Sequence, residues 1–106
     1  MGAVSLAGVV ARASLVVIYT GRLEECREFY TSLGLEFEAE QHGDGPPHYA
    51  AVLHDGLVIE LYPGGPERRT GALRLAFEVD GLSGGAPGRQ VLRDPDGRPV
   101  EVLVRE

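Results

Sequence analysis

The sequence predicts a single α+β domain in which a β-α-β-β-β unit is followed by a shortened second copy of that unit. One helical stripe of apolar residues lies among short runs rich in β-branched and aromatic residues, which predict strands. The motif "DGLVIEL" recurs as "DGRPVEV" at an offset of 41 residues, from Asp55 to Asp96. In each copy a carboxylate, Glu60 or Glu101, follows within an apolar strand. A chain of 106 residues accommodates one such domain, residues 1–106.

The first unit spans about residues 13–63. Residues 13–20, "ASLVVIYT", form an apolar, β-branched run typical of a buried strand. Residues 21–34 predict a helix that ends near Gly34, because apolar side chains recur there at helical spacing. Residues 35–40 alternate apolar and acidic side chains, which predicts a strand with one buried face. The helical stripe consists of Leu23, Cys26, Phe29, Tyr30 and Leu33.

Residues 48–63 predict a β-hairpin that turns at the "DG" pair, residues 55–56. Two registers are open. A two-residue turn, which we favour, places Ala51 opposite Glu60 and turns His48 and His54 toward the side that packs on the helix. A three-residue turn with a bulge places His48 opposite Tyr62, on the same side as Glu60.

The second unit spans about residues 72–105, after a linker at about 64–71. It opens with the strand "ALRLAFEVDGL", turns at "DPDG" and closes with the strand "RPVEVLV". Aligning the opening strands of the two units gives an offset of about 58 residues, so the second copy is shorter by about 17 residues. That is about the length of a helix with its connection. We therefore expect the second unit to lack its helix, with the flexible segment "SGGAPGRQ" in its place.

The composition limits the classes of partner and compartment. A formal net charge of −6 excludes nucleic acids and anionic membranes as natural partners, because their phosphates attract Lys and Arg. No apolar run approaches the ~18 residues of a membrane helix. The one cysteine, Cys26, is expected to be a core residue and fits a reducing cytoplasm.

The order of these segments resembles the vicinal oxygen chelate superfamily, which includes glyoxalase I, bleomycin-resistance proteins and extradiol dioxygenases. The resemblance rests on "LEECREFYTSLGLEFEAE", "LVIELYP", "LAFEVDGL" and "VLRDPDGRPVEVL", and runs from about Ala13 to Val104. It implies paired βαβββ modules whose curled mixed sheet surrounds a cavity. Because the cavity of the family is often completed by dimerisation, we also expect a homodimer.

The resemblance also implies where a metal would bind. The metal enzymes of the family take one ligand from the first strand and one from the fourth strand of each module. The fourth-strand positions match Glu60 and Glu101, and the first-strand positions fall on Leu15 and Leu73, or on Arg74 if the repeat offset is 59. Because leucine has no lone pair, we expect a degenerate metal site that binds at most a weak divalent ion.

We therefore expect metal-independent binding of a small, partly apolar molecule, in the manner of the resistance proteins. Glu60 and Glu101 would anchor polar or cationic groups, and Tyr49 and Tyr62 would supply apolar walls. A competing hypothesis is a divalent-metal-dependent lyase, isomerase or dioxygenase that uses Glu60 and Glu101 as ligands, joined by His48 if the hairpin turns it inward. A third is an interaction module with a vestigial cavity. No catalytic residue is assigned.

For the other polar residues we expect structural or solvent-exposed roles. Asp94 and Asp96 are turn formers in "DPDG". His42 lies in a Gly-rich loop, from which it either reaches over the cavity or contacts solvent. Arg68 is expected to be solvated.

Overall fold

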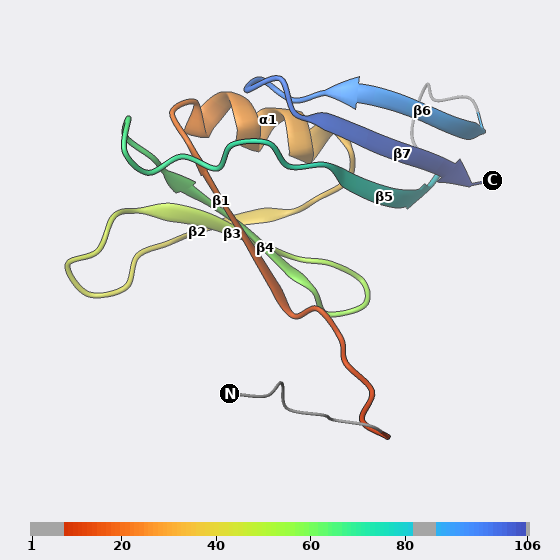
Figure 1. Ribbon diagram of the computed structural model, residues 1–106, viewed down its shortest axis with the longest axis horizontal. Helices are drawn as coiled ribbons and strands as arrows, with labels where there is room; N and C mark the ends of the chain where they lie inside the picture. Colours follow the sequence, from red (N-terminus) through yellow and green to blue (C-terminus); the bar gives the residue numbers. More distant parts are fainter. Residues whose placement is uncertain (1–7, 82–86, 106) are drawn as a thin grey trace, which may run out of the picture.

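The computed structural model describes residues 8–81 and 87–105. Within them the chain forms two sheets, with strand orders β1-β4-β3-β2 and β5-β7-β6, that do not close into a barrel. Figure 1 shows the only helix of these residues, α1, lying above the first sheet and beside the strands of the second. The elements are β1 (Leu15–Thr20), α1 (Leu23–Ser32), β2 (Phe37–Glu40), β3 (His48–Val52), β4 (Val58–Pro63), β5 (Leu75–Asp80), β6 (Gly88–Arg93) and β7 (Pro99–Arg105).

The predicted α+β class and the internal repeat are confirmed. In each sheet a parallel pair, β1 with β4 or β5 with β7, has an antiparallel neighbour, β3 or β6. Val17 pairs with Glu60 in the first sheet, and Ala76 pairs with Glu101 in the second. Because Val17 and Ala76 are equivalent, the repeat offset of the opening strands is 59 residues, the alternative value.

The second unit differs from its prediction at β6. We expected "SGGAPGRQ" to be flexible and the two strands of the second unit to be separated by a gap. Instead, Gly88–Arg93 forms a strand that pairs with β7. This edge strand shows no apolar alternation because its residues are exposed except for the half-buried Leu92. Within the described residues the second sheet contains counterparts of β1, β3 and β4 but none of β2 or α1. Residues 82–86, part of the segment expected to replace a second helix, lie outside the described residues.

One core joins the helix to both sheets. The predicted helical stripe is correct, since Cys26 and Tyr30 are fully buried and Leu33 nearly so. Burial of about ten such side chains is the main favourable contribution to folding, at roughly 25 cal/mol per Å² of apolar surface. Among the described residues, no helix is long and apolar enough to cross a membrane. The core consists of Ile18, Cys26, Tyr30, Leu33, Leu35, Ala51, Ile59, Leu61, Val100, Val102 and Val104.

The β3–β4 hairpin adopts the register that we did not favour. Ala50, not Ala51, pairs with Glu60, so the two-residue turn is wrong and a three-residue turn is present. The N–H of Gly56 donates to the carbonyl of Leu53 at 2.9 Å, and Gly56 has a φ of +95°. Only a residue that tolerates this left-handed conformation forms the bulge that shifts the register by one. The shift turns His48 to the face of Glu60.

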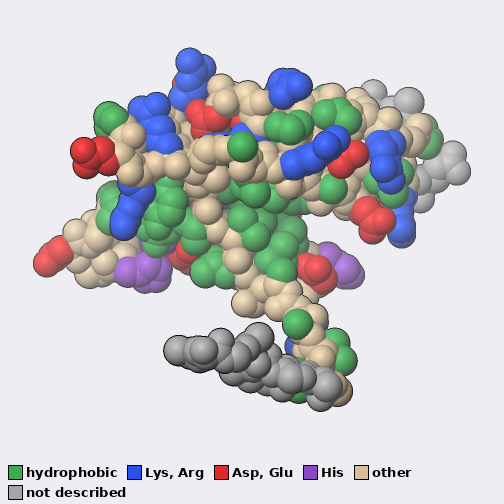
Figure 2. Space-filling view, in the orientation of Figure 1, with side chains coloured by type: hydrophobic (Ala, Val, Ile, Leu, Met, Phe, Trp, Pro, Cys, Tyr) green, Lys and Arg blue, Asp and Glu red, His purple; other side chains and the backbone are tan. Residues whose placement is uncertain are grey.

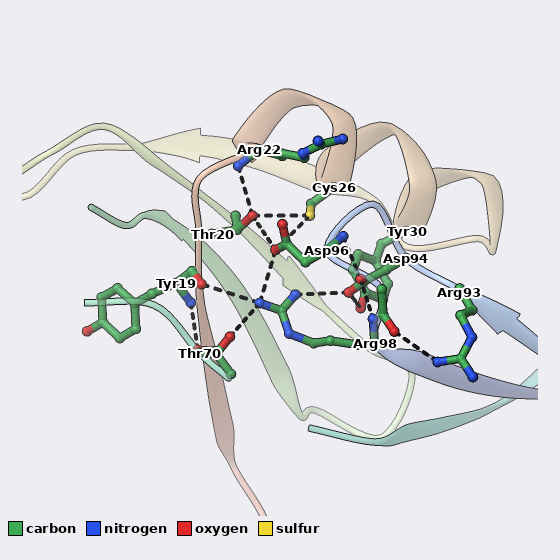
Figure 3. A network of polar contacts seen from close by, with 11 residues as sticks. Tyr19, Thr20, Arg22, Cys26, Tyr30, Thr70, Arg93, Asp94, Asp96 and Arg98 are labelled. Atoms are coloured by element: carbon green, nitrogen blue, oxygen red, sulfur yellow. Dashed lines mark hydrogen bonds and ion pairs between the residues drawn. The ribbon is translucent and has the colours of Figure 1, made fainter. Parts of the chain in front are cut away.

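A buried polar network ties the second unit to the first (Figure 3). Arg98, only 5% exposed, donates to Asp94 at 2.9 Å and forms an ion pair with Asp96 at 3.0 Å. It also donates to the carbonyl of Thr70 at 2.9 Å. Tyr30 of α1 donates to Asp94 at 2.7 Å. A turn of the second unit is thereby connected to the linker and to the helix.

Asp94 and Asp96 are therefore more than turn formers. The predicted turn role is confirmed, because the Oδ1 atom of Asp94 accepts hydrogen bonds from the N–H groups of Asp96 and Arg98. In addition, the hydroxyl of Thr20 at the end of β1 donates to Asp96 at 2.5 Å. Burying charge is tolerated only where partners of this kind surround it.

Candidate functional site

Each sheet turns one face to the shared core and the other outward. In β4, Ile59 and Leu61 face the core, and Glu60 and Tyr62 face outward. In β7, Val100 and Val102 face the core, and Glu101 faces outward. Glu60 and Glu101 therefore each lie on the face of their own sheet that points away from the core. A cavity shared by both glutamates stays a prediction.

A row of polar and aromatic side chains crosses the outer face of the first sheet. Glu40 of β2 pairs with His48 of β3. The His48 ring stacks on Tyr62 of β4, with 4.0 Å between centroids, and Tyr62 contacts Tyr19 of β1 at 5.6 Å. At the end of the row the guanidinium of Arg68 lies over the ring of Tyr19, 5.3 Å from its centroid. The row therefore offers an acidic end, a flat aromatic centre and a basic end.

The acidic end of this row is a cluster of two histidines and two glutamates. The side chain of His48, 1% exposed, directs Nε2 to Glu40 Oε1 at 3.3 Å and to Glu60 Oε2 at 3.7 Å. His42, from the loop between β2 and β3, directs its own Nε2 to Glu40 Oε1 at 3.5 Å. One ligand atom from each of the four residues lies within 4.8 Å of the other three. These nitrogen and oxygen atoms are able to hold a metal ion.

Sequence reasoning missed the part that Glu40 plays. The alternation of residues 35–40 correctly predicted that Glu40 points away from the core, but not which side chains lie beside it. That depends on the pairing of Glu40 with His48 and on the register of the next hairpin. His42 contacts Glu40 at this face, and its side chain is 72% exposed to solvent, which was one of its two expected positions.

The rest of the outer face is apolar. Val17 pairs with Glu60, and the next pair on the same face of these strands is Leu15 with Val58. Leu15 is 53% exposed and Val52, at the end of β3, is 69% exposed. Figure 2 shows hydrophobic side chains grouped over the region of the first sheet, with acidic and histidine side chains at its margins. A partly apolar molecule with a polar group would complement such a surface.

The phenol of Tyr62 is a hydrogen-bond donor at this face. Desolvation, and then the negative charge of Glu60, raise the pKa of Tyr62 above its usual range. The hydroxyl therefore stays protonated at neutral pH. Together, Tyr62 and Glu60 present one donor and one anionic acceptor.

Glu101 has a different environment on the second sheet. Arg74 Nε lies 3.5 Å and Arg89 Nη1 3.8 Å from its carboxylate. Arg74 occupies one of the two first-strand positions considered, so the place of a family metal ligand is taken by a cation. The pocket beside Glu101 has a volume of 180 Å³. It is lined by Ala76, Phe77, Glu78, Arg89, Glu101 and Leu103.

Other residues singled out from the sequence lie away from this face. Tyr49 faces α1, where its hydroxyl donates to Glu24 at 2.5 Å, so the sheet separates it from Tyr62. Cys26 is buried, as predicted for a core residue, and this burial raises the pKa of its thiol. His54 is exposed in the β3–β4 turn. The direct neighbours of Glu60 and Glu101 in the first strands, Val17 and Ala76, offer no ligand atom.

Residues 12–83 match the family model of the Glyoxalase/Bleomycin resistance protein/Dioxygenase superfamily. The chain belongs to this superfamily. The resemblance stated from the sequence is thereby confirmed. Glu60 lies in β4, inside the matched residues, and Glu101 lies in β7, its counterpart in the second sheet. A comparison with curated proteins gave no significant match.

Solved structures show the same superfamily fold. TnmS3, an antibiotic binding protein from Streptomyces sp. CB03234, has 19% identity and a TM-score of 0.63, over 92% of this chain and 98% of that one. The integron cassette protein VCH_CASS1, from the mobile metagenome of V. cholerae, has 19% identity and a TM-score of 0.62 over the same shares. A glyoxylase/bleomycin resistance protein/dioxygenase domain from Frankia sp. EAN1pec has 23% identity and a TM-score of 0.57, over 92% and 100%.

Proposed function

We propose that this protein binds a small, partly apolar molecule on the outer face of its first sheet, with Glu60 and Tyr62 as polar anchors. The observation that carries this proposal is that the carboxylate of Glu60 and the protonated phenol of Tyr62 share one sheet face with the exposed apolar side chains of Leu15 and Val52. Membership of the superfamily and the likeness to the antibiotic binding protein TnmS3 support a ligand of this kind. The binding mode needs no metal at the inherited positions, because Leu15 and Arg74 stand at the first-strand positions and the residues paired with the two glutamates, Val17 and Ala76, offer no ligand atom.

The charge of the face favours a ligand with a cationic or hydrogen-bond-donating group. Glu38, Glu40 and Glu60 all point outward from the first sheet. Among the described residues, the ion pairs of Glu40 and Glu60 are made with histidines alone. A cationic group above the ring of Tyr62 would gain roughly 0.5–2 kcal/mol from the aromatic face in addition to these carboxylates.

We propose that a second copy of the chain closes the site. The 180 Å³ pocket beside Glu101 is smaller than the roughly 300–1,000 Å³ that encloses a drug-sized ligand. A pocket of 480 Å³ between residues 71–74 and 96–99 is lined by neither Glu60 nor Glu101. The outer face of the first sheet bears Glu38, Glu40 and Glu60, whereas that of the second bears Arg74, Arg89 and Arg93 beside Glu78 and Glu101. A homodimer that apposes the two faces would complement these charges and cover their apolar residues. Such a protein would work in the cytoplasm, as its single cysteine suggests.

Thermal shift and calorimetry with a panel of aromatic and cationic antibiotics test the binding surface. A ligand at a free concentration of about 100 times its Kd should raise the free energy of unfolding by about 2.7 kcal/mol. Tyr62→Leu and Glu60→Gln should weaken the binding about 10-fold or more. Tyr49→Phe, on the opposite face of the same sheet, is the matched control and should leave it unchanged. Equal losses in Tyr49→Phe and Tyr62→Leu would place the ligand elsewhere.

Light scattering and mixtures of variants test whether a second copy of the chain closes the site. The chain should elute with twice its mass of 11.4 kDa. If the site combines the Glu60 face of one protomer with the Glu101 face of its partner, Glu60→Gln and Glu101→Gln each weaken both sites. Mixing the two variants should then restore binding at one site of each heterodimer. A monomer at micromolar concentration, or a mixture as weak as its components, would contradict the composite site.

A further inference from the structure

We infer that Glu40, His42, His48 and Glu60 form a binding site for a divalent transition-metal ion, with Zn²⁺ as the best-fitting ion. The site is distinct from the inherited one, which draws on the first and fourth strands of both modules. Of the four ligands, only Glu60 stands at an inherited position. The other three come from β2, from the loop that follows it and from β3.

The buried imidazole of His48 carries the inference. Its Nδ1 atom lies 3.1 Å from the carbonyl oxygen of Pro46. Because a carbonyl can only accept, we assign the ring proton to Nδ1, which leaves a lone pair on Nε2. That lone pair points at two carboxylate oxygens, of Glu40 and Glu60, at 3.3 and 3.7 Å. Three acceptors therefore converge at a side chain that is 1% exposed.

Convergent acceptors repel one another and favour a positive charge between them, because burial makes an uncompensated polar group costly. This need is strongest at His48, which is 1% exposed, and at Glu60, which is 16% exposed, and weaker at Glu40, which is 39% exposed. A metal ion would bind the Nε2 lone pair and both carboxylates. A hydrogen bond from Nδ1–H to a backbone carbonyl is also the usual support of a metal-binding histidine, because it sets the tautomer and the ring orientation. A proton on Nε2 would meet the same electrostatic need, and the experiment below separates the two.

The spacing of the ligand atoms suits a small ion. Tetrahedral Zn²⁺ with bonds of about 2.0–2.2 Å holds its ligand atoms about 3.3–3.6 Å apart. Three pairs in the cluster already lie at 3.3, 3.5 and 3.7 Å, and all four atoms lie within 4.8 Å of one another. The other three pairs lie within 4.8 Å and would contract on binding, and His42, whose side chain is 72% exposed, has room to move.

The ligand types and charges select the class of metal. Two imidazole nitrogens and two carboxylate oxygens suit Zn²⁺, Co²⁺ or Ni²⁺, whereas Mg²⁺ and Ca²⁺ prefer oxygen ligands throughout. Two carboxylates and two neutral imidazoles balance the charge of a divalent ion. The stack of His48 on Tyr62 holds the buried ligand in place, so binding mainly orders His42 and Glu40.

The test is calorimetric titration of the untagged full chain with ZnCl₂ at pH 8, after dialysis against chelator. We expect one Zn²⁺ per chain, and visible absorption bands of four-coordinate Co²⁺ when cobalt replaces zinc. Loss of a ligand in His42→Gln should weaken the affinity roughly 100-fold, because even supporting partners are worth about 10–100-fold. His42 is exposed, so this variant should fold, which circular dichroism checks. His54→Gln, an exposed histidine outside the cluster, should retain full affinity.

Each other outcome overturns the inference. Absence of bound Zn²⁺ would show that the cluster does not hold the metal. Equal weakening by His54→Gln and His42→Gln would mean non-specific surface binding. Tyr62→Phe keeps the stacked ring and should leave Zn²⁺ affinity within about twofold while weakening a small-molecule ligand through the lost hydroxyl. This pair of measurements distinguishes failure of the metal site from failure of the proposed ligand-binding function.

Discussion

The ring of His48 lies flat against the ring of Tyr62, with 4.0 Å between their centroids and 11° between their planes. The two residues belong to neighbouring antiparallel strands and meet because the intervening turn has three residues. One residue fewer in that turn would place His48 on the opposite face, against the helix. The stack therefore links the geometry of one hairpin turn to the composition of the candidate site.

A double-mutant cycle should detect this stack as a coupling energy. His48→Ala and Tyr62→Ala should interact by about 0.5–1.5 kcal/mol in the free energy of unfolding, because a stacked pair stabilises beyond the area it buries. Urea unfolding in the presence of chelator gives the free energy of unfolding of the parent chain, the two single variants and the double variant. The pair His54→Ala and Tyr62→Ala, which lacks a contact, should be additive. Additivity in the His48 cycle would contradict the stack.

The turn itself should depend on Gly56. Gly56→Ala should lower the free energy of unfolding by about 1–2 kcal/mol, because a side chain disfavours the left-handed conformation. No atom lies within 4 Å of the added Cβ, so the cost is conformational rather than steric. Gly56→Asn should cost less, since asparagine tolerates this conformation.

Gly65→Ala is the matched control for this turn. Gly65 also has open space around its Cβ, but its φ lies outside the left-handed range. Its substitution should change the free energy of unfolding by less than about 0.5 kcal/mol. The same urea titration compares the three variants, and a neutral Gly56→Ala would show that the bulge tolerates alanine.

The buried pair of Arg98 and Asp94 should matter more than any surface ion pair. Arg98→Met removes the partner of a fully buried carboxylate and should destabilise the chain by about 3–5 kcal/mol. Arg105→Met breaks a pair of the same length, 2.9 Å to Glu78, whose members are both exposed. That variant should cost no more than about 1 kcal/mol. Equal shifts of the two urea midpoints would contradict the structural role of the network.

Tyr30 should make the protein sensitive to alkali. Its burial, and then its hydrogen bond to Asp94, raise the pKa of the phenol far above the ordinary value of 10.0. A raised pKa in the folded state contributes stability that is fully present below about pH 10 and is lost as the pH rises beyond it. The free energy of unfolding should therefore fall between pH 10 and pH 11.5.

Tyr30→Phe is the variant that assigns this pH dependence. It should lose about 1 kcal/mol at pH 7 with the hydrogen bond to Asp94, and its stability should fall less steeply above pH 10. Part of the slope should persist, since the pKa of Tyr62 is raised as well. Urea unfolding at pH 7, 9, 10.5 and 11.5 provides the comparison. Identical slopes in the variant and the parent chain would exclude Tyr30 as the source.

Several features followed from local sequence patterns. Helical spacing placed Cys26 and Tyr30 in the core, and the repeated Asp-Gly motif placed Glu60 and Glu101 at equivalent positions of two strands. The edge strand β6 was not predicted, because an exposed edge strand needs no apolar periodicity to pair with its neighbour. The exposed residues of such a strand look like those of a loop.

The sequence by itself determined the class of fold, the order of most elements and the outward direction of Glu40, Glu60 and Glu101. These depend on periods of 2 and 3.6 residues, which are local properties of the chain. The tertiary structure decided that His48 joins Glu40 and Glu60, that Tyr49 faces the helix, and that Arg74 and Arg89 lie beside Glu101. These depend on strand register and on contacts between residues far apart in sequence. A one-residue difference in a turn reverses every side chain that follows, while leaving the local pattern unchanged.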